Sequence, residues 1–387
     1  MFGYRMPTHV HIEPGCLVRL PEAVRALGLD SVQLVVDPGL AATHWVGEAI
    51  DLLESTGIRH QVFHKVESNP RTSTVTTLAE SVRAHELAGV VALGGGSVLD
   101  AAKAAAMLAT NEFRIEQYEG KNRYANAPLP MIAVPTTCGT GSEVTWVSVL
   151  SHEPTHSKIS VKGESMFPDM ALVDADLIAT LPAKLVAYTG LDALTHALEA
   201  TTCTASNSVS DALAEKAIAL LLRYLPEAVD NVGGNDTARN AVMRASTLAG
   251  LAFGNADVAG VHCLSESLGG LYDHPHGMLN SMLLVPVLRY HQRFIEPRLA
   301  ELGGLLSGDA ADKAPGPDAP EGERADHFLE HLQRLTRMLK VPAFSTLAIP
   351  EADYPKISVH ATMNGSNRSN PQPMAARNYQ EILEDLD

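Results

Sequence analysis

Two candidate metal ligands, Asp192 and His196, lie four residues apart in the segment GLDALTHALEA. On a helix, this spacing puts a carboxylate and an imidazole on one face, where both can bind one ion. Further along the chain, His262 lies in GVHCLSES, and His274 and His276 lie in DHPHG. One carboxylate and three imidazoles leave a bound divalent ion with net positive charge, so the ion can polarise a carbonyl oxygen as a Lewis acid.

Histidine alone is weak evidence for a metal site, because the chain has 16 histidines. A lone histidine is more often a surface or core residue than a ligand. Spacing does not choose between His274 and His276. The nucleophile pattern GxSxG and the Walker A pattern are both absent from the sequence.

A glycine-rich turn, Gly94-Gly95-Gly96-Ser97, follows the aliphatic run 89–93 and precedes the helical stretch 98–109, which contains Asp100. Glycines let a backbone approach a pyrophosphate closely, and the first amides of the next helix stabilise its charge. The pattern therefore predicts a dinucleotide site that includes Asp100. Leu99 breaks the GxGxxG fingerprint, and a plain turn between strand and helix remains the alternative.

Two other turns follow aliphatic runs and could contact the same cofactor. The segment 136–143 (TTCGTGSE) supplies Thr136, Thr137 and Ser142, which could line a ribose or phosphates. Asp37 follows the run 32–36, where a carboxylate can bind a ribose and repel a 2′-phosphate, which favours NAD over NADP. A polar turn and an Asp-Pro turn are the simpler interpretations of these two segments.

The elements that must position these residues divide the chain in two. Short aliphatic runs at 32–36, 89–93, 131–134 and 170–174 alternate with helical stretches such as 74–87 and 98–109. This alternation predicts a parallel sheet covered by helices, with ligands at the carboxyl ends of its strands. Ala- and Leu-rich helical segments follow at 184–202, 207–230, 237–254 and 261–271. We expect an α/β domain over 1–180, a helical domain over 181–387, and an exposed loop without chemistry at 304–324.

Composition excludes several classes of protein. The chain has 387 residues, a formal net charge of −16 and 45% hydrophobic residues, which indicates a globular protein that repels nucleic acid and anionic membranes. Neither a signal peptide nor an apolar run long enough for a membrane helix is visible. The four cysteines form no CxxC pair. We therefore expect a cytoplasmic protein with free thiols.

Together the segments resemble the iron-containing (group III) alcohol dehydrogenases over most of the chain. The stretches that carry the resemblance include GGGSVLDAAKA, PTTCGTGSEVT, LPAKLVAYTGLDALTHALEA and HCLSESLGGLYDHPHGMLNSMLLVPVL, in the order typical of the family. The resemblance implies a dehydroquinate-synthase-like fold with an N-terminal dinucleotide-binding domain, an all-helical metal-binding domain and a homodimeric assembly.

The resemblance also assigns the sites, residue by residue. Matching by motif puts the metal, Fe²⁺ or Zn²⁺, on Asp192, His196, His262 and His276, and leaves His274 outside. The pyrophosphate of NAD(H) falls on Gly94, Gly95, Gly96 and Ser97, and the nucleotide ribose on Asp37. Thr136, Thr137 and Ser142 fall in the cofactor cleft.

The chain departs from the family pattern at two positions. Glu266 stands four residues after His262, where many members have a histidine close to the reacting carbon. Glu266 and His262 are therefore the catalytic candidates, and Glu266 could relay a proton, contact the metal or substrate, or pair with a basic side chain in the pocket wall. Cys138 replaces a small residue and could narrow the nicotinamide site or be an inert buried thiol.

The implied reaction is hydride transfer between NAD(H) and a small aldehyde or primary alcohol, with the metal polarising the substrate oxygen. Functionalised aldehydes such as phosphonoacetaldehyde, lactaldehyde or a semialdehyde fit the family as well as simple ones. Two alternatives remain: a dehydroquinate-synthase-like lyase, whose motifs do not match, and a non-catalytic member of the family. The complete ligand set favours the enzyme.

Overall fold

The computed structural model describes residues 3–40 and 43–386. The chain forms two compact units, one over Arg5–Thr180 and another whose main part begins at Leu181. Each unit has its own core and is described by itself.

The first unit is built on a six-stranded sheet with the strand order β1-β9-β6-β4-β2-β3. All neighbouring strands in it are parallel. The strands are β1 (His9–Ile12), β2 (Ser31–Val36), β3 (Arg59–Phe63), β4 (Gly89–Gly94), β6 (Met131–Pro135) and β9 (Met170–Val173). Every residue of β2, β4 and β6 is buried, which explains their continuous aliphatic sequences. The edge strands β1 and β3 are partly exposed and more polar.

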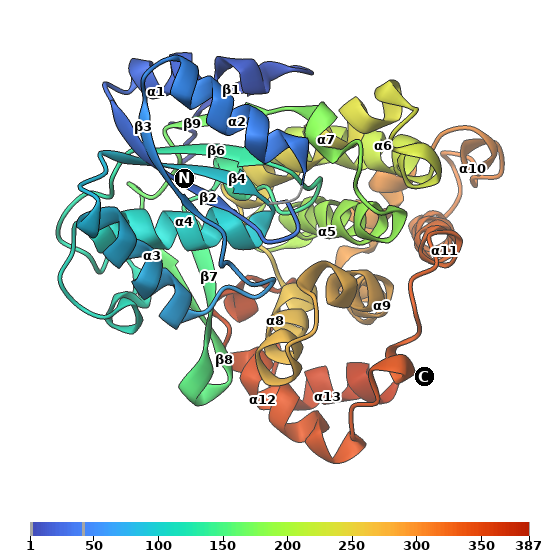
Figure 1. Cartoon of the computed structure of the whole chain (residues 1–387). Helices are drawn as coiled ribbons and strands as arrows, with labels where there is room; N and C mark the ends of the chain where they lie inside the picture. Colours follow the sequence, from blue (N-terminus) through green and yellow to red (C-terminus); the bar gives the residue numbers. More distant parts are fainter. Residues whose placement is uncertain (1–2, 41–42, 387) are drawn as a thin grey trace. The chain divides into compact units, whose positions relative to one another are not determined.

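Helices cover both faces of this sheet (Figure 1). They are α1 (Leu20–Ala26), α2 (His44–Ser55), α3 (Thr72–Ala84) and α4 (Gly96–Ala109). Because side chains alternate along a strand, neighbouring residues of β4 enter different cores: Val90 and Ala92 pack with α3 and α4, whereas Val91 and Leu93 pack with α1 and α2. The parallel sheet and its helical cover confirm the expected architecture of this unit.

A small second sheet lies on the α4 side of the first unit. Its strands are β5 (Gly120–Lys121), β7 (Val147–His152) and β8 (Ser157–Lys162), in the order β5-β8-β7. β7 and β8 are antiparallel, and β7 packs against α4. Aliphatic runs did not indicate this sheet, because β7 and β8 are mostly half-buried and carry polar residues between their buried ones.

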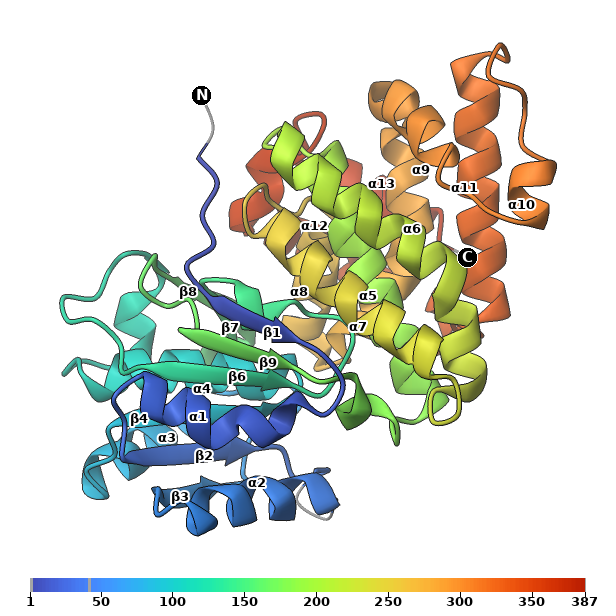
Figure 2. The same cartoon turned by 90° about the horizontal axis from the view of Figure 1, so that it is seen from above.

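The second unit is helical, and the described residues from Leu181 onward contain no strand. Its helices are α5 (Ala183–Thr202), α6 (Ser208–Asn231), α7 (Asp236–Phe253), α8 (Gly260–Tyr272), α9 (His276–Gly303), α10 (Asp309–Asp312), α11 (Glu321–Met338), α12 (Tyr354–Met363) and α13 (Ala376–Glu384). α5 packs against α6, α7 and α9, and α11 lies along α9 (Figure 2). Among the described residues, no helix combines the length and apolar character needed to cross a bilayer.

The segment 304–324 is more ordered than we predicted. Instead of one exposed loop, it contains α10, and α11 already begins at Glu321. Glu321 and Glu323 lie in the first turn of α11, where negative charge stabilises the helix dipole. The buried residues Phe328 and Leu332 further along anchor the helix in the core. The acidic composition that suggested a loop is therefore partly the beginning of a helix.

Candidate metal centre

Helix α5 carries three polar side chains into a buried environment. Asp192, His196 and Glu199 follow one another at intervals of four and three residues, so they share one face of the helix. Every residue from Leu191 to Thr202 is buried, because α6, α7 and α9 surround this part of α5. The alanine- and leucine-rich sequence suits such a central helix, since both residues have high helix propensity.

Four predicted ligands come together around this face of α5. Asp192 and His196 meet His262 from α8 and His276, which is the first residue of α9. Their ligand atoms all lie within 4.8 Å of one another. The rings of His196 and His262 are stacked with their centroids 4.6 Å apart. His274 is not part of the cluster, and its ring instead stacks with Tyr272.

The donor set fits a divalent cation. Asp192, His196 and His262 are buried and His276 is partly exposed, so four acceptor groups converge where water is scarce. Asn280 Nδ2 lies 2.6 Å from Asp192 Oδ1, and 3.1 Å and 3.0 Å from Nε2 of His262 and His276. One amide has only two N–H hydrogens, so it cannot satisfy all of these acceptors. The Asn280 Oδ1 atom is itself buried without a partner among the described residues. A cation between the four groups would remove this imbalance.

Glu199 connects α5 to the third member of the cluster. Its Oε2 lies 2.5 Å from His262 Nδ1, and its Oε1 accepts a hydrogen bond of 2.7 Å from the backbone amide of Val261. Burial by itself would lower the pKa of His262, but the hydrogen bond and charge of Glu199, with the charge of Asp192, outweigh it and raise that pKa. We did not predict Glu199, although it lies seven residues after Asp192 on the same helix face.

The glycine-rich turn of the first unit begins α4. A Cβ at Gly96 would lie 2.5 Å from Thr140 Cγ2, and one at Gly95 would lie 3.1 Å from Thr137 Cγ2. Close approach of the 137–140 loop therefore leaves no room for a side chain at Gly96 and little at Gly95, which itself has an ordinary extended backbone. Ser97 follows in the first turn of α4 and donates to the carbonyl of Ser68. The N-terminal amides of α4 provide a site for an anion.

Asp100 and Ser142, which we expected to contact the cofactor, are hydrogen-bonded to each other, and their contact with the cofactor stays a prediction. Ser142 Oγ donates to Asp100 Oδ1 over 2.6 Å, and the amide of Val149 donates to Asp100 Oδ2 over 2.9 Å. The buried Lys103 donates to the carbonyls of Ser142 and Val147. Spacing could not reveal that this lysine faces inward. These hydrogen bonds hold the 142–149 segment on α4.

Asp37 and Thr136 follow strands that are neighbours of β4, so they lie at the same edge of the sheet as the glycine-rich turn. Thr136 is buried, and its amide donates to the carbonyl of Gly94. Asp37 Oδ1 accepts a hydrogen bond of 2.9 Å from the amide of Leu40, so Asp37 stabilises a turn, as the simpler interpretation expected. Burial raises the pKa of Asp37 against the opposing effect of the amides of Leu40 and Gly39. Thr137 is partly exposed at this edge, and Cys138 is buried and forms no disulfide bond.

Comparison with known proteins covers both units. The model of the iron-containing alcohol dehydrogenases matches residues 7–175, and the model of the C-terminal domain of the Fe-containing alcohol dehydrogenase family matches residues 186–386. The chain belongs to the iron-containing alcohol dehydrogenase family.

Individual members of the family match the chain over nearly its full length. The 1,3-propanediol dehydrogenase of Klebsiella pneumoniae is 35% identical over 99% of this chain and 97% of its own. A crystal structure of a 1,3-propanediol oxidoreductase superposes with a TM-score of 0.95 at 33% identity and covers 100% of both chains. The sulfoacetaldehyde reductase of Bifidobacterium kashiwanohense, solved in complex with NAD⁺, has a TM-score of 0.87 at 27% identity and covers 100% of this chain and 98% of that one.

Membership in the family confirms four expectations. The family itself, the two-unit fold and an oxidoreductase of the alcohol dehydrogenase type are as predicted. The expectation of NAD(H) and a divalent metal as cofactors is confirmed at the level of the family.

Glu266, where this dehydrogenase departs from many members of the family, lies on α8 one turn after His262. The two side chains share a face of α8. Burial lowers the pKa of His262 and Glu199 raises it most strongly, while the charge of Glu266 makes a smaller contribution in the same direction as Glu199. Glu266 is partly exposed, and its Oε2 accepts a hydrogen bond of 2.7 Å from Asn364 Nδ2. The hydrogen-bond partner of Glu266 is thus a neutral amide, whereas our simpler interpretation expected a basic side chain.

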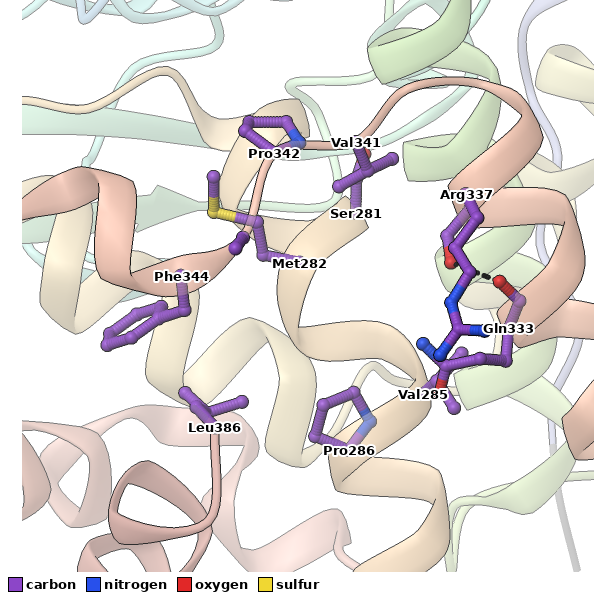
Figure 3. A pocket seen from close by; sticks show the side chains of 12 residues that line it. Ser281, Met282, Val285, Pro286, Gln333, Arg337, Val341, Pro342, Phe344 and Leu386 are labelled. Carbon is purple, nitrogen blue, oxygen red and sulfur yellow. Dashed lines mark hydrogen bonds between the residues drawn. The ribbon is translucent and has the colours of Figure 1, made fainter.

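A pocket of about 270 Å³ opens elsewhere in the helical unit of this dehydrogenase (Figure 3). Met282, Val285 and Pro286 of α9 line it together with Arg337 of α11 and Phe344. None of the four clustered ligands lines this pocket. The cavity is therefore separate from the metal centre.

Proposed function

We propose that this dehydrogenase interconverts a small alcohol and its aldehyde with NAD(H), using one divalent metal bound by Asp192, His196, His262 and His276. The observation that carries the proposal is the convergence of these four ligand atoms within 4.8 Å in a buried environment. A bound metal would supply Lewis-acid polarisation of the substrate oxygen, and the nicotinamide would accept or donate the hydride.

The residues that hold the metal favour iron or zinc. One carboxylate and three imidazoles suit either Fe²⁺ or Zn²⁺, whereas Mg²⁺ and Ca²⁺ prefer oxygen ligands. We propose Fe²⁺, which the family's description as iron-containing supports.

The first unit, which we take as the domain 1–180, is the proposed NAD-binding domain. The amides at the N-terminus of α4, with Gly94, Gly95, Gly96 and Ser97, would bind the pyrophosphate. Asp37 would accept hydrogen bonds from the nucleotide ribose, and Thr136 and Thr137 would line the adjoining edge of the sheet. The hydrogen bond between Asp100 and Ser142 would hold the loop after Thr136 and Thr137 against α4.

The second unit, residues 181–387, is the proposed metal-binding and catalytic domain, and Glu266 indicates its substrate. Among the described residues, the carboxylate of Glu266 accepts one hydrogen bond, from the neutral amide of Asn364, so it can still accept one from a substrate hydroxyl. It would also repel an anionic substrate. We therefore propose uncharged hydroxyaldehydes and diols as substrates, in preference to phosphonoacetaldehyde. The 1,3-propanediol dehydrogenases among the relatives support this choice.

We also propose that the protein is a cytoplasmic homodimer. The four cysteines are buried and none of them forms a disulfide bond, which suits a reducing compartment. The dimer rests on the family resemblance, and light scattering of the purified protein tests it directly.

A metal assay and an aldehyde screen test the proposed function together. The purified protein is stripped with a chelator, reloaded anaerobically with Fe²⁺ or with Zn²⁺, and assayed for NADH oxidation with neutral hydroxyaldehydes, simple aldehydes and phosphonoacetaldehyde. We expect one metal per chain and metal-dependent turnover that is highest with the neutral hydroxyaldehydes. Metal binding without turnover on any aldehyde would favour a lyase, and absence of both would favour a non-catalytic member of the family.

A further inference from the structure

We infer that Glu199 is a positioning residue, whose carboxylate sets the tautomer and orientation of His262 so that its Nε2 faces the metal. The inference rests on the proposed metal site and adds a residue to it that is not a ligand. Glu199 is absent from the group of ligand atoms that lie within 4.8 Å of one another.

The two nitrogens of the His262 ring face different partners. Nδ1 lies 2.5 Å from Glu199 Oε2, and Nε2 lies 3.1 Å from Asn280 Nδ2, the atom that also contacts Asp192 and His276. Nε2 therefore points into the ligand cluster while Nδ1 points away from it. His262 and Glu199 are 3% and 2% exposed, so water does not compete for this contact.

The chemistry of imidazole explains why this arrangement matters. A neutral ring carries one N–H and one lone pair, and only the lone pair can bind a metal. A carboxylate accepts hydrogen bonds but cannot donate them, so it holds the proton on Nδ1 and leaves the lone pair on Nε2. The negative charge also makes Nε2 a stronger ligand.

The same carboxylate fixes the helix that carries His262. The residue before α8 is Ala259, whose side chain cannot cap the helix, and the amide of Val261 lies in the first turn. Glu199 accepts the hydrogen of this amide over 2.7 Å and places negative charge at the positive end of α8. One face of α5 thus supplies two proposed ligands and the group that orients a third.

Glu199→Gln tests the inference, because the new side chain keeps the size of glutamate and one accepting oxygen. That oxygen can still cap Val261, which leaves the NH₂ group to face His262 Nδ1. An NH₂ donor there favours the opposite tautomer, with hydrogen on Nε2, where the metal would bind. We expect affinity for Zn²⁺ to fall about 10- to 100-fold in competition with a chelator. The visible spectrum of the Co²⁺-loaded protein should also change, because the ligand geometry is altered.

Controls separate positioning from a purely structural role. Glu330→Gln, at an exposed site on α11, should bind Zn²⁺ like the wild type. The metal-free Glu199→Gln protein should melt close to the wild type, since the cap on α8 is preserved.

If Glu199→Gln does not fold, Glu199→Asp keeps the charge but shortens the side chain, and the same loss of affinity is expected. Zn²⁺ affinity within twofold of wild type, with an unchanged Co²⁺ spectrum, would overturn the inference alone. A wild-type protein that binds no divalent metal would overturn the proposed function with it.

Discussion

His274 and His276 lie two residues apart, but only His276 joins the ligand cluster. His276 begins α9 and its Nε2 lies 3.6 Å from Asp192 Oδ1, whereas the ring of His274 stacks with Tyr272 at a centroid distance of 6.3 Å. The pair provides a matched comparison of a proposed ligand and a neighbour of the same type.

His276→Ala should weaken Zn²⁺ binding by at least about 100-fold, more than the loss expected for a residue that only orients a ligand. His274→Ala should leave metal content and turnover close to wild type. Elemental analysis after gel filtration measures the metal content of both variants, and NADH oxidation measures their turnover. NADH binding should largely survive in both variants, because the proposed dinucleotide site lies in the other unit. Equal metal loss in the two variants would contradict the assignment of His276.

Asp37 should make the enzyme prefer NAD(H) to NADP(H). A carboxylate near a 2′-phosphate repels it by about 1 kcal/mol at 4 Å even in water, which corresponds to a severalfold loss of affinity for each charge pair. Asp37→Gly should therefore narrow the ratio of kcat/KM for the two cofactors. Asp51→Asn, at an exposed carboxylate of α2, is the control and should leave the ratio unchanged. A wild-type preference for NADPH would show that Asp37 does not face the ribose.

If Glu266 accepts a proton or a hydrogen bond from a substrate hydroxyl, Glu266→Gln should lower turnover in alcohol oxidation about tenfold or more. This is a conservative figure, because a general base usually contributes more than tenfold. Glutamine keeps the size of the side chain and can still bond to Asn364, so the fold should not change. The pH profile of kcat for wild type and variant, measured beside Glu330→Gln, checks this. Retained turnover with an unchanged profile would leave Glu266 as part of the pocket wall.

His291 should make the protein less stable in mild acid. The ring is 2% exposed, and burial lowers its pKa to about 4 against the opposing effects of Glu199 and Asn370. The unfolded chain binds this proton near pH 6.5 and the folded chain does not, so stability falls as pH drops from 6.5 toward 4. At pH 5 the loss is about 2 kcal/mol.

His291→Gln removes this titration, and comparison of urea unfolding at pH 7 and pH 5 isolates it. The variant should lose less stability between the two pH values than wild type, by about 2 kcal/mol. His156→Gln, at an exposed histidine, corrects for the rest of the protein and should behave like wild type. An equal loss in wild type and His291→Gln would show that the buried ring is not the cause.

Much of the fold was predictable because local sequence has a clear physical signature when an element is fully buried. The central strands β2, β4 and β6 are buried on both faces, so each appears as an uninterrupted aliphatic run. The edge strands β1 and β3, with sequences HVHI and RHQVF, pack on fewer neighbours and were not predicted. Helix starts and ends differed by a few residues, as at α3, which we expected over 74–87 and which spans Thr72–Ala84.

In the candidate site, the sequence by itself determined the contacts that depend on helix geometry, such as the shared face of Asp192 and His196. Helix geometry did not determine which groups lie opposite them: His262 was assigned only by the family resemblance, and Asn280 was not predicted, because both come from other helices. Glu199 and Asp100 show the same limit: both are polar residues at helical spacing, yet one orients a proposed ligand and the other holds a loop. Because a helix has 3.6 residues per turn, spacing determines which face of the helix a side chain occupies. The group that this side chain contacts depends on packing between elements that are distant in the chain.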